Sequence, residues 1–222
     1  MTGIEFHSYA PADGHGLRHD PLNAIIAPRP IGWIATRDRQ GRRNLAPYSF
    51  FNAFNYDPPI IGFSSIAWKD SVRNASETRE FTWSLVTREL GEAMNDSSAP
   101  VPPGIDEFGL AGVTEAPGWK VAAPRVAEAR AAMECRVVDI VRFRNQAGEP
   151  VSGWLVLGEV VAVHIDRRLL VDGVYQTAEA RPILRGGGLH DYAQITPDSM
   201  FRIRRLPGAS LKAHHGDPDA AA

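Results

Sequence analysis

Cysteine is almost absent from this sequence of 222 residues, which contains only one, Cys135. A single cysteine cannot form an internal disulfide, so we expect a buried, unreactive thiol in the strand-like segment MECRVVDIV and no redox chemistry by thiols. A surplus of positive charge is absent too, because the net charge is -2 and the lysines and arginines are scattered. Without a basic stripe, neither nucleic acid nor an anionic membrane is an expected partner.

Long apolar runs are also missing. No stretch approaches the roughly 20 consecutive apolar residues that a membrane-spanning helix needs. The first twenty residues, MTGIEFHSYAPADGHGLRHD, have neither the basic start nor the apolar core of a secretory signal. We therefore expect a cytoplasmic protein. A chain of this length, without internal repeats or low-complexity blocks, is expected to bury one core as a single large domain.

Apolar and polar residues alternate in several short segments, which is the pattern of half-buried strands. It predicts strands at 31–37, 44–54, 59–65, 80–87, 135–144, 152–166 and 200–206. Helical spacing predicts short helices at 69–78, at 88–96 and at the start of 126–134. Strands and helices do not alternate in the βαβ manner. The expected fold class is therefore mainly β, an antiparallel closed barrel with a few short helices.

The predicted strand at 44–54, NLAPYSFFNAF, is rich in aromatic residues. Phe50 and Phe51 are adjacent, so their side chains must point to opposite faces of the strand. Both faces therefore need cover. It could come from the protein's own core, from a second chain or from a flat aromatic ligand.

Motifs for hydrolysis, metal binding and nucleotide binding are scarce. No G-x-S-x-G elbow is present. His15 and His19 are four residues apart but have no third ligand nearby, and His214 and His215 lie in the C-terminal tail, so no metal site is expected. The run GGGLH at 186–190 matches neither the dinucleotide fingerprint nor the P-loop and is expected to form a flexible turn.

The segment SSIAWKDS contains the groups of an anion site. Ser64 and Ser65 end a predicted strand, and Lys69 and Ser71 arrive with the amino end of a predicted helix. Free backbone N–H groups, an ammonium and hydroxyls at one place suit a phosphate. Asp70 fits there only if its carboxylate turns back to cap the helix. Ordinary helix capping beside a solvated lysine is the alternative interpretation.

The motifs together resemble a known family. Along the chain they occur in the order RPIGWIAT, a glycine turn, NLAPYSFFNAF, DPP, a strand ending in serine, KDS, NASETREFTWSLV and ILRGGGLHDYA. This order is similar to that of the flavin reductase-like family, which has the FMN-binding split-barrel fold, and the chain also resembles flavoredoxins. The resemblance implies an antiparallel Greek-key split β-barrel over residues 21–206. An irregular arm at 1–20 precedes it, and a flexible tail at 207–222 follows it.

The same resemblance implies a homodimer that binds FMN at its interface and receives hydride from NAD(P)H. No catalytic side chain is required, because the flavin ring itself accepts the hydride. The implied FMN-binding residues are Tyr48, Ser49, Phe50 and Asn52 along the ring edge, Ser64, Lys69, Asp70 and Ser71 at the phosphate, and Arg29 and Trp33 near the flavin. For Trp33, a purely structural place in the core is the alternative.

One segment departs from the resemblance. Reductase components of two-component monooxygenases carry a late Gly-Asp-His that helps to bind nicotinamide, whereas this chain has Gly-Leu-His-Asp-Tyr at 188–192. We expect His190 on the nicotinamide or substrate side. Three functions follow: an FMN-dependent NAD(P)H oxidoreductase that reduces a flavin or a protein acceptor such as a partner oxygenase, a non-enzymatic FMN electron carrier, or a dimeric ligand-binding module on the same barrel.

Overall fold

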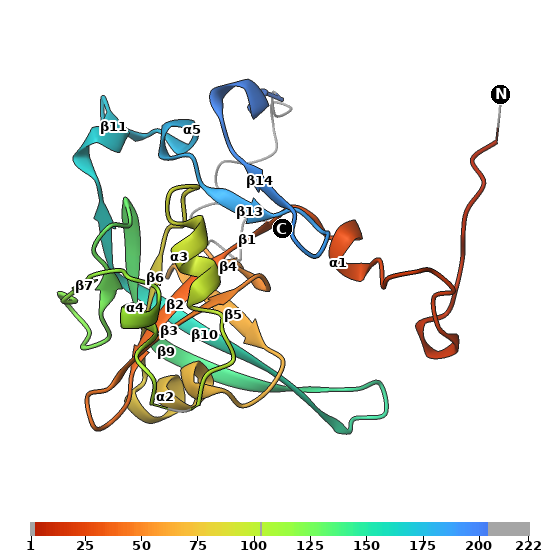
Figure 1. Ribbon diagram of the computed structural model, residues 1–222, viewed down its shortest axis with the longest axis horizontal. Coiled ribbons are helices and arrows are strands. Elements are labelled where there is room, and N and C mark those ends of the chain that lie inside the picture. Colours follow the sequence, from red (N-terminus) through yellow and green to blue (C-terminus); the bar gives the residue numbers. More distant parts are fainter. Residues whose placement is uncertain (1–2, 103, 204–222) are drawn as a thin grey trace, which may run out of the picture.

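A curled antiparallel sheet of seven strands forms the body of the protein (Figure 1). The structure is a computed structural model that describes residues 3–102 and 104–203. Across the sheet the strands follow the order β3-β2-β6-β9-β10-β5-β4. Their bounds are β2 Gly32–Arg37, β3 Arg43–Tyr48, β4 Phe51–Asn55, β5 Ile60–Ser65, β6 Glu80–Ser84, β9 Ala131–Arg144 and β10 Pro150–Ile165. The expected mainly antiparallel β fold with short helices is confirmed.

Shorter elements lie around this sheet. A second sheet contains β1 (Arg29–Pro30), β13 (Ile183–Arg185) and β14 (Tyr192–Gln194), and two ribbons pair β7 (Glu115–Ala116) with β8 (Arg125–Val126) and β11 (Leu170–Val171) with β12 (Val174–Tyr175). The helices are α1 Leu22–Ile25, α2 Asp70–Thr78, α3 Gly91–Asp96, α4 Glu107–Leu110 and α5 Thr177–Ala180, with 3-10 turns η1 Pro11–Asp13, η2 Arg167–Leu169 and η3 Pro197–Ser199. None of the helices described is long and apolar enough to cross a membrane.

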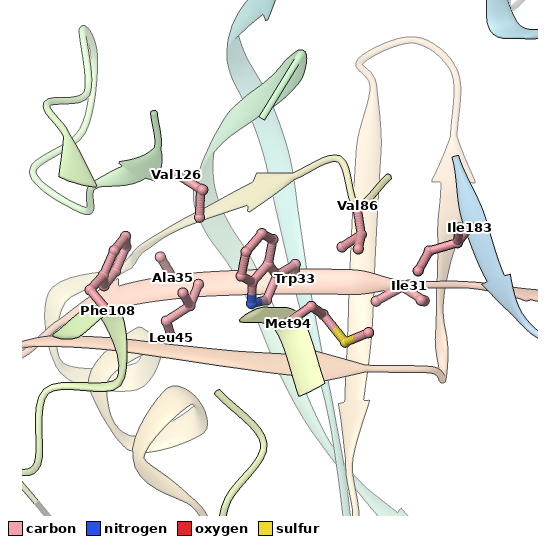
Figure 2. Close-up of a cluster of buried hydrophobic side chains, with 9 residues drawn as sticks. All are labelled: Ile31, Trp33, Ala35, Leu45, Val86, Met94, Phe108, Val126 and Ile183. Carbon is pink, nitrogen blue, oxygen red and sulfur yellow. The ribbon is translucent and has the colours of Figure 1, made fainter. Parts of the chain in front are cut away.

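Strand β2 lies between two apolar cores and is buried on both faces. On one face Ile31, Trp33 and Ala35 pack with side chains from α3 and α4 (Figure 2). On the other face Ile34 joins a cluster inside the curled sheet, into which α2 inserts Val72. Burying large apolar side chains on both sides of one strand is a major source of stability. The buried position of β2 also holds its hairpin partner β3 in place, and the candidate site lies at the end of β3.

The cluster around Ile34, inside the curled sheet, leaves no room for a side chain at Gly158 on β10. A Cβ atom there would lie 2.4 Å from Cε1 of Phe81 and 2.9 Å from Cβ of Cys135. We expect Gly158→Ala to lower the free energy of unfolding by about 1–3 kcal/mol, because the packed core must shift to admit it. Gly91→Ala is the control, since its added Cβ would make only ordinary contact at 3.5 Å. Chemical denaturation followed by circular dichroism would check both variants.

The single cysteine has the expected structural place. Cys135 lies on β9 with no exposed surface. Burial raises the pKa of its thiol, and the negative charge of Glu134 raises the pKa further. The thiolate form is therefore suppressed, which leaves the side chain as a small apolar group in the core.

The aromatic segment at 44–54 forms two strands, so the prediction of one strand is wrong. Strand β3 ends at Tyr48 and pairs with β2, whereas β4 begins at Phe51 and pairs with β5. The chain bends at Ser49 and Phe50, where it changes partner. Phe51 stacks on Trp83 with the ring centroids 5.7 Å apart, while Phe50 is exposed. The two neighbouring phenylalanines thus face opposite sides, as predicted.

The predicted helix at the start of 126–134 is also wrong. Val126 ends β8, Ala127 and Glu128 form a turn, and Ala131 and Ala132 are buried in β9, which pairs with β10 and β6. Pairing with two strands outweighs the helix propensity of alanine. The predicted strand at 200–206 is not formed over 200–203, and its remainder lies outside the described residues. The other predicted strands and the helices at 69–78 and 88–96 are confirmed within a few residues.

The N-terminal residues stand apart from the sheet. Residues 3–20 contain only the short turn η1 and extend away from the body (Figure 1). Ile4 and Phe6 are largely exposed on this segment. These residues belong to the predicted arm at 1–20. The predicted tail at 207–222 lies outside the described residues.

Candidate functional site

Three adjoining hollows meet at Pro47, near the end of β3. Each is lined in part by Pro47, and their volumes are about 410, 420 and 240 Å³. We name them after one lining residue each, the His190, Lys69 and Ser64 hollows, and together they form the Pro47 groove. The two larger hollows fall in the size range of small-molecule sites. The three hollows therefore adjoin at one place in the fold and offer space for a small-molecule ligand.

The Lys69 hollow lies at the amino end of α2. Lys69 is the exposed N-cap residue, and Ser71 is buried one residue into the helix. The Oγ of Ser71 accepts a hydrogen bond from Nδ2 of Asn44 at 2.9 Å. Burial raises the pKa of Tyr48 beside them, and hydrogen bonding with Ser71 and Ser65 opposes this rise. A cation, hydroxyl groups and a helix amino end thus come together, as the sequence predicted.

Two carboxylates also line the Lys69 hollow. Asp70 does not cap α2, because this helix has no side-chain cap hydrogen bond. Instead, Oδ1 of Asp70 accepts from Nη1 of Arg73 at 2.8 Å, which offsets its charge. Glu107 on α4 is the second carboxylate and was not predicted. Burial raises its pKa, and the charges of Asp70 and Asp106 raise it further.

The Ser64 hollow joins β3 to the end of β5. Its lining includes Tyr48, Ser49, Phe50, Ser64 and Lys69. The backbone N–H of Ser64 donates to the carbonyl of Phe50 at 2.7 Å, which holds the bend after β3 against β5. These five residues were all predicted from the sequence, three of them for the ring edge and two for the phosphate. The local sequence sets their order, and the pairing of β4 with β5 brings them together.

The His190 hollow adds residues from distant parts of the chain. Ser49 and His190 both line it, together with Asn95 on α3. Nη2 of Arg185 donates to the carbonyls of Gly188 and Leu189 at 3.1 and 3.2 Å, which fixes the turn before His190. The structure thus places His190 next to the predicted ring-edge strand. Asn95 carries no signal in the sequence, because only the fold brings it here, whereas Arg185 belongs to the motif ILRGGGLHDYA.

Three predicted residues lie outside the groove. Asn52 is exposed on β4, and its Oδ1 accepts from the backbone N–H of Ala53 at 2.8 Å. Arg29 is buried, donates to the carbonyls of Asn23 and Ile26, and lies 5.8 Å from the ring centroid of Phe50. Arg29 therefore contacts two residues that line the Ser64 hollow, Asn23 and Phe50.

Trp33 is the third, and its side chain has no exposed surface. Its Nε1 donates to Oγ of Ser97 at 2.9 Å, and Ser97 lines the Lys69 hollow. The structure thus places Trp33 in the core, where it contacts a residue that lines the groove but does not line the groove itself. The alternative given for Trp33 from the sequence, a purely structural place, agrees with this position.

The fold identifies the structural class of the protein, and sequence similarity identifies its family. A split-barrel protein from Shewanella frigidimarina shares 24% sequence identity with the chain and covers 85% of it and 90% of its own length, with a TM-score of 0.71. This likeness confirms the predicted split-barrel fold. The flavin reductase like domain family matches residues 26–183, so the chain belongs to this family, as predicted.

Other proteins support the same assignment. A protein from Deinococcus radiodurans is 41% identical over 201 residues, which is 85% of each chain. Nitrilotriacetate monooxygenase component B from Bacillus cereus is 29% identical, covers 91% of this chain and 98% of its own, and has a TM-score of 0.78. Similarity therefore extends over nearly the whole described chain.

Proposed function

We propose that the protein binds FMN in the Pro47 groove and passes hydride or electrons from NAD(P)H through the flavin to a flavin or protein acceptor. The observation that carries this proposal is the groove itself, which joins the Lys69 hollow at one end to the His190 hollow at the other. Membership of a flavin reductase-like family supports the choice of cofactor. We place this activity in a domain at 21–206, with the arm at 1–20 outside it.

The donor set of the Lys69 hollow fits the phosphate of FMN. Lys69 would supply an ammonium and Ser71 a hydroxyl, and Ser64 would add a hydroxyl from the adjoining Ser64 hollow, which Lys69 also lines. The charge of Asp70 is already offset by Arg73. Oε2 of Glu107 accepts from the backbone N–H of Leu45 at 3.3 Å. Both carboxylates at this end therefore already have partners within the protein.

The remaining residues of the groove would hold the flavin ring next to the ring of a nicotinamide or an acceptor. A bound flavin supplies the chemistry, because its ring accepts the hydride directly. The segment Tyr48, Ser49 and Phe50 would lie along the ring edge, and backbone N–H groups near the ring would stabilise negative charge on it. His190 lines the far hollow, where a nicotinamide or an acceptor would be oriented. No side chain of the protein needs to act as a nucleophile.

We also propose that two copies form a homodimer. Strand β4 is an edge strand of the seven-stranded sheet, and it exposes Phe54 while Phe50 precedes it. Ile66 and Trp68 are exposed just after β5. An exposed edge and clustered apolar side chains favour association with a second chain. Asn52, which is exposed on the same strand, would then approach the partner subunit. Sedimentation analysis of the protein and of Phe54→Asp would test this.

Spectroscopy and rapid mixing test the proposed activity. The purified protein should bind FMN, and NADH or NADPH should bleach the visible absorbance of the bound flavin in an anaerobic stopped-flow experiment. Reduction by dithionite or by a reductase protein, but by neither pyridine nucleotide, would instead show the electron carrier. A preparation that takes up no added FMN would overturn the proposal in favour of another ligand. With turnover established, adding a candidate oxygenase would test for a protein acceptor.

We expect Lys69→Ala to weaken FMN binding by about 1–3 kcal/mol, because it removes a charge-assisted hydrogen bond to the phosphate. Lys120→Ala is the matched control, since the ammonium of Lys120 lies over the ring of Trp119, 4.3 Å from its centroid, and outside the groove. Titration of FMN fluorescence would give both affinities. Equal affinity in the wild type and in Lys69→Ala would remove Lys69 from the phosphate site.

A further inference from the structure

A separate hollow of about 540 Å³ lies between β8, the end of β10 and the turn η2. We call it the Arg125 hollow. It shares no lining residue with the Pro47 groove. Its walls carry three arginines, Arg125, Arg130 and Arg168, and two apolar side chains of β10, Val163 and Ile165. A cavity of this size with a few convergent polar groups has the character of a ligand site.

Arg125 is the group in this hollow that lacks a protein partner. Its Nε is fully enclosed and makes no hydrogen bond, and within residues 3–102 and 104–203 its guanidinium has no hydrogen bond or ion pair. An arginine has no acceptor capacity and must find oxygen acceptors for its N–H groups. Buried polar groups without partners are rare in folded proteins, so this one needs an explanation.

The backbone around Arg125 is held from both sides. The carbonyl of Pro124 accepts from Oγ1 of Thr82, and the N–H of Val126 donates to Oγ of Ser84 at 3.1 Å. Both hydroxyls come from the central strand β6. Arg125 therefore starts from a fixed point of the sheet, and its side chain is aimed by the fold rather than by a loose loop.

The other charges of the hollow leave a positive surplus. Nε of Arg130 and Nη2 of Arg168 lie 3.3 and 2.7 Å from Oδ2 of Asp166, so one carboxylate serves two guanidiniums. The carboxylate of Glu128 accepts from the backbone N–H of Thr114 at 2.9 Å. Three arginines against two carboxylates give a net charge of +1, before any contribution from His164. The surplus falls on Arg125, which neither carboxylate contacts.

We propose that the Arg125 hollow binds a small organic anion, with its carboxylate or phosphate group on Arg125 and its apolar part against Val163 and Ile165. Guanidinium groups recognise both kinds of oxyanion through paired hydrogen bonds. The side chains of Val163 and Ile165 are 52% and 37% exposed, so they offer apolar surface to a ligand. The volume exceeds what a bare oxyanion or one water would fill, which favours an organic body.

The test uses the full chain saturated with FMN, so that a phosphate probe cannot enter the Lys69 hollow. Isothermal titration with benzoate and with phenyl phosphate should show saturable binding of at least one of them, which identifies the head group. Arg125→Gln should weaken that binding at least tenfold and leave the affinity for FMN unchanged. Arg142→Gln is the control, because Arg142 lies over the ring of Trp154 and outside the hollow, and it should bind as the wild type does.

A second variant tests the site independently, in case Arg125→Gln weakens binding by disturbing the fold. Val163→Asp places a negative charge on an exposed wall position and should also weaken the probe at least tenfold, with an unchanged circular dichroism spectrum. If neither probe binds the wild type, the proposal is overturned. Equal binding by the wild type and Arg125→Gln overturns it as well.

Discussion

Replacing Glu134 by alanine is expected to lower the free energy of unfolding by about 3–5 kcal/mol, because it removes a buried carboxylate and leaves its hydrogen-bond partners without an acceptor. Glu134 lies on β9 and has no exposed surface. Its carboxylate accepts from the backbone N–H groups of Trp119, Lys120 and Val121 at 2.6, 2.6 and 3.1 Å. Nε2 of His164 lies 2.6 Å from Oε1 of the same carboxylate. Without Glu134, three backbone donors lose their acceptor and the loop loses its anchor to the sheet.

The pH dependence of this stabilisation has a definite sign. Burial on its own raises the pKa of Glu134, but the hydrogen bonds from the backbone and from His164 outweigh it, so the pKa lies below its ordinary value. A carboxyl with a lowered pKa stabilises the fold above its unfolded pKa of about 4.3 and loses this effect as the pH falls through its folded pKa. The difference in stability between the wild type and Glu134→Ala should therefore be full at pH 7 and shrink below about pH 4.

Chemical denaturation at pH 7 and at low pH would measure both effects. Glu77→Ala is the control, since Glu77 is exposed on α2, and its removal should change the stability by less than about 0.5 kcal/mol. Glu134→Gln tests the charge separately. Its amide can accept on one side only, so it should recover part of the stability but lose the pH dependence. A loss below about 1 kcal/mol in Glu134→Ala would contradict the anchoring role.

The role of Glu134 also shows why sequence reasoning reaches some features and not others. Short-range patterns predicted β2, β10 and α2, because each buries a face that its own residues define. The groups at 64–71 were predicted to lie together because they are neighbours in the chain. No local pattern marks Glu134 as an anchor, since its partners at 119–121 reach it only through the fold.

The errors have the same physical origin. Ala131 and Ala132 follow a helix-favouring segment, yet β9 holds them because its long pairing with β10 outweighs local propensity. The bend at Ser49 and Phe50 arises because β3 and β4 pair with different strands, which no property of residues 44–54 specifies. In the candidate site, His190 was assigned to the substrate side by resemblance. Its neighbour Asn95 on α3 could be found only in three dimensions.

Replacing Trp33 separates a structural role from direct contact with the flavin. Trp33→Ala should lower the free energy of unfolding by about 3–5 kcal/mol, because Trp33 is fully buried at the centre of the cluster in Figure 2. Since the total stability of a domain is about 5–15 kcal/mol, this variant should unfold at a markedly lower denaturant concentration. A loss of FMN binding in it would therefore not identify a ligand contact.

Trp33→Phe makes the distinction because it keeps one aromatic ring in the core and removes the five-membered ring of the indole with its N–H. Oγ of Ser97 would lose its donor but could still donate to the carbonyl of Met94, at 2.7 Å. We expect a loss of about 1–3 kcal/mol in stability, from the lost hydrogen bond and the small cavity, and less than about a threefold change in FMN affinity, measured by denaturation and by fluorescence titration. A change above tenfold in FMN affinity, with the fold intact, would show that Trp33 acts on the flavin. The present geometry argues against that, because the indole is fully buried and lines none of the three hollows.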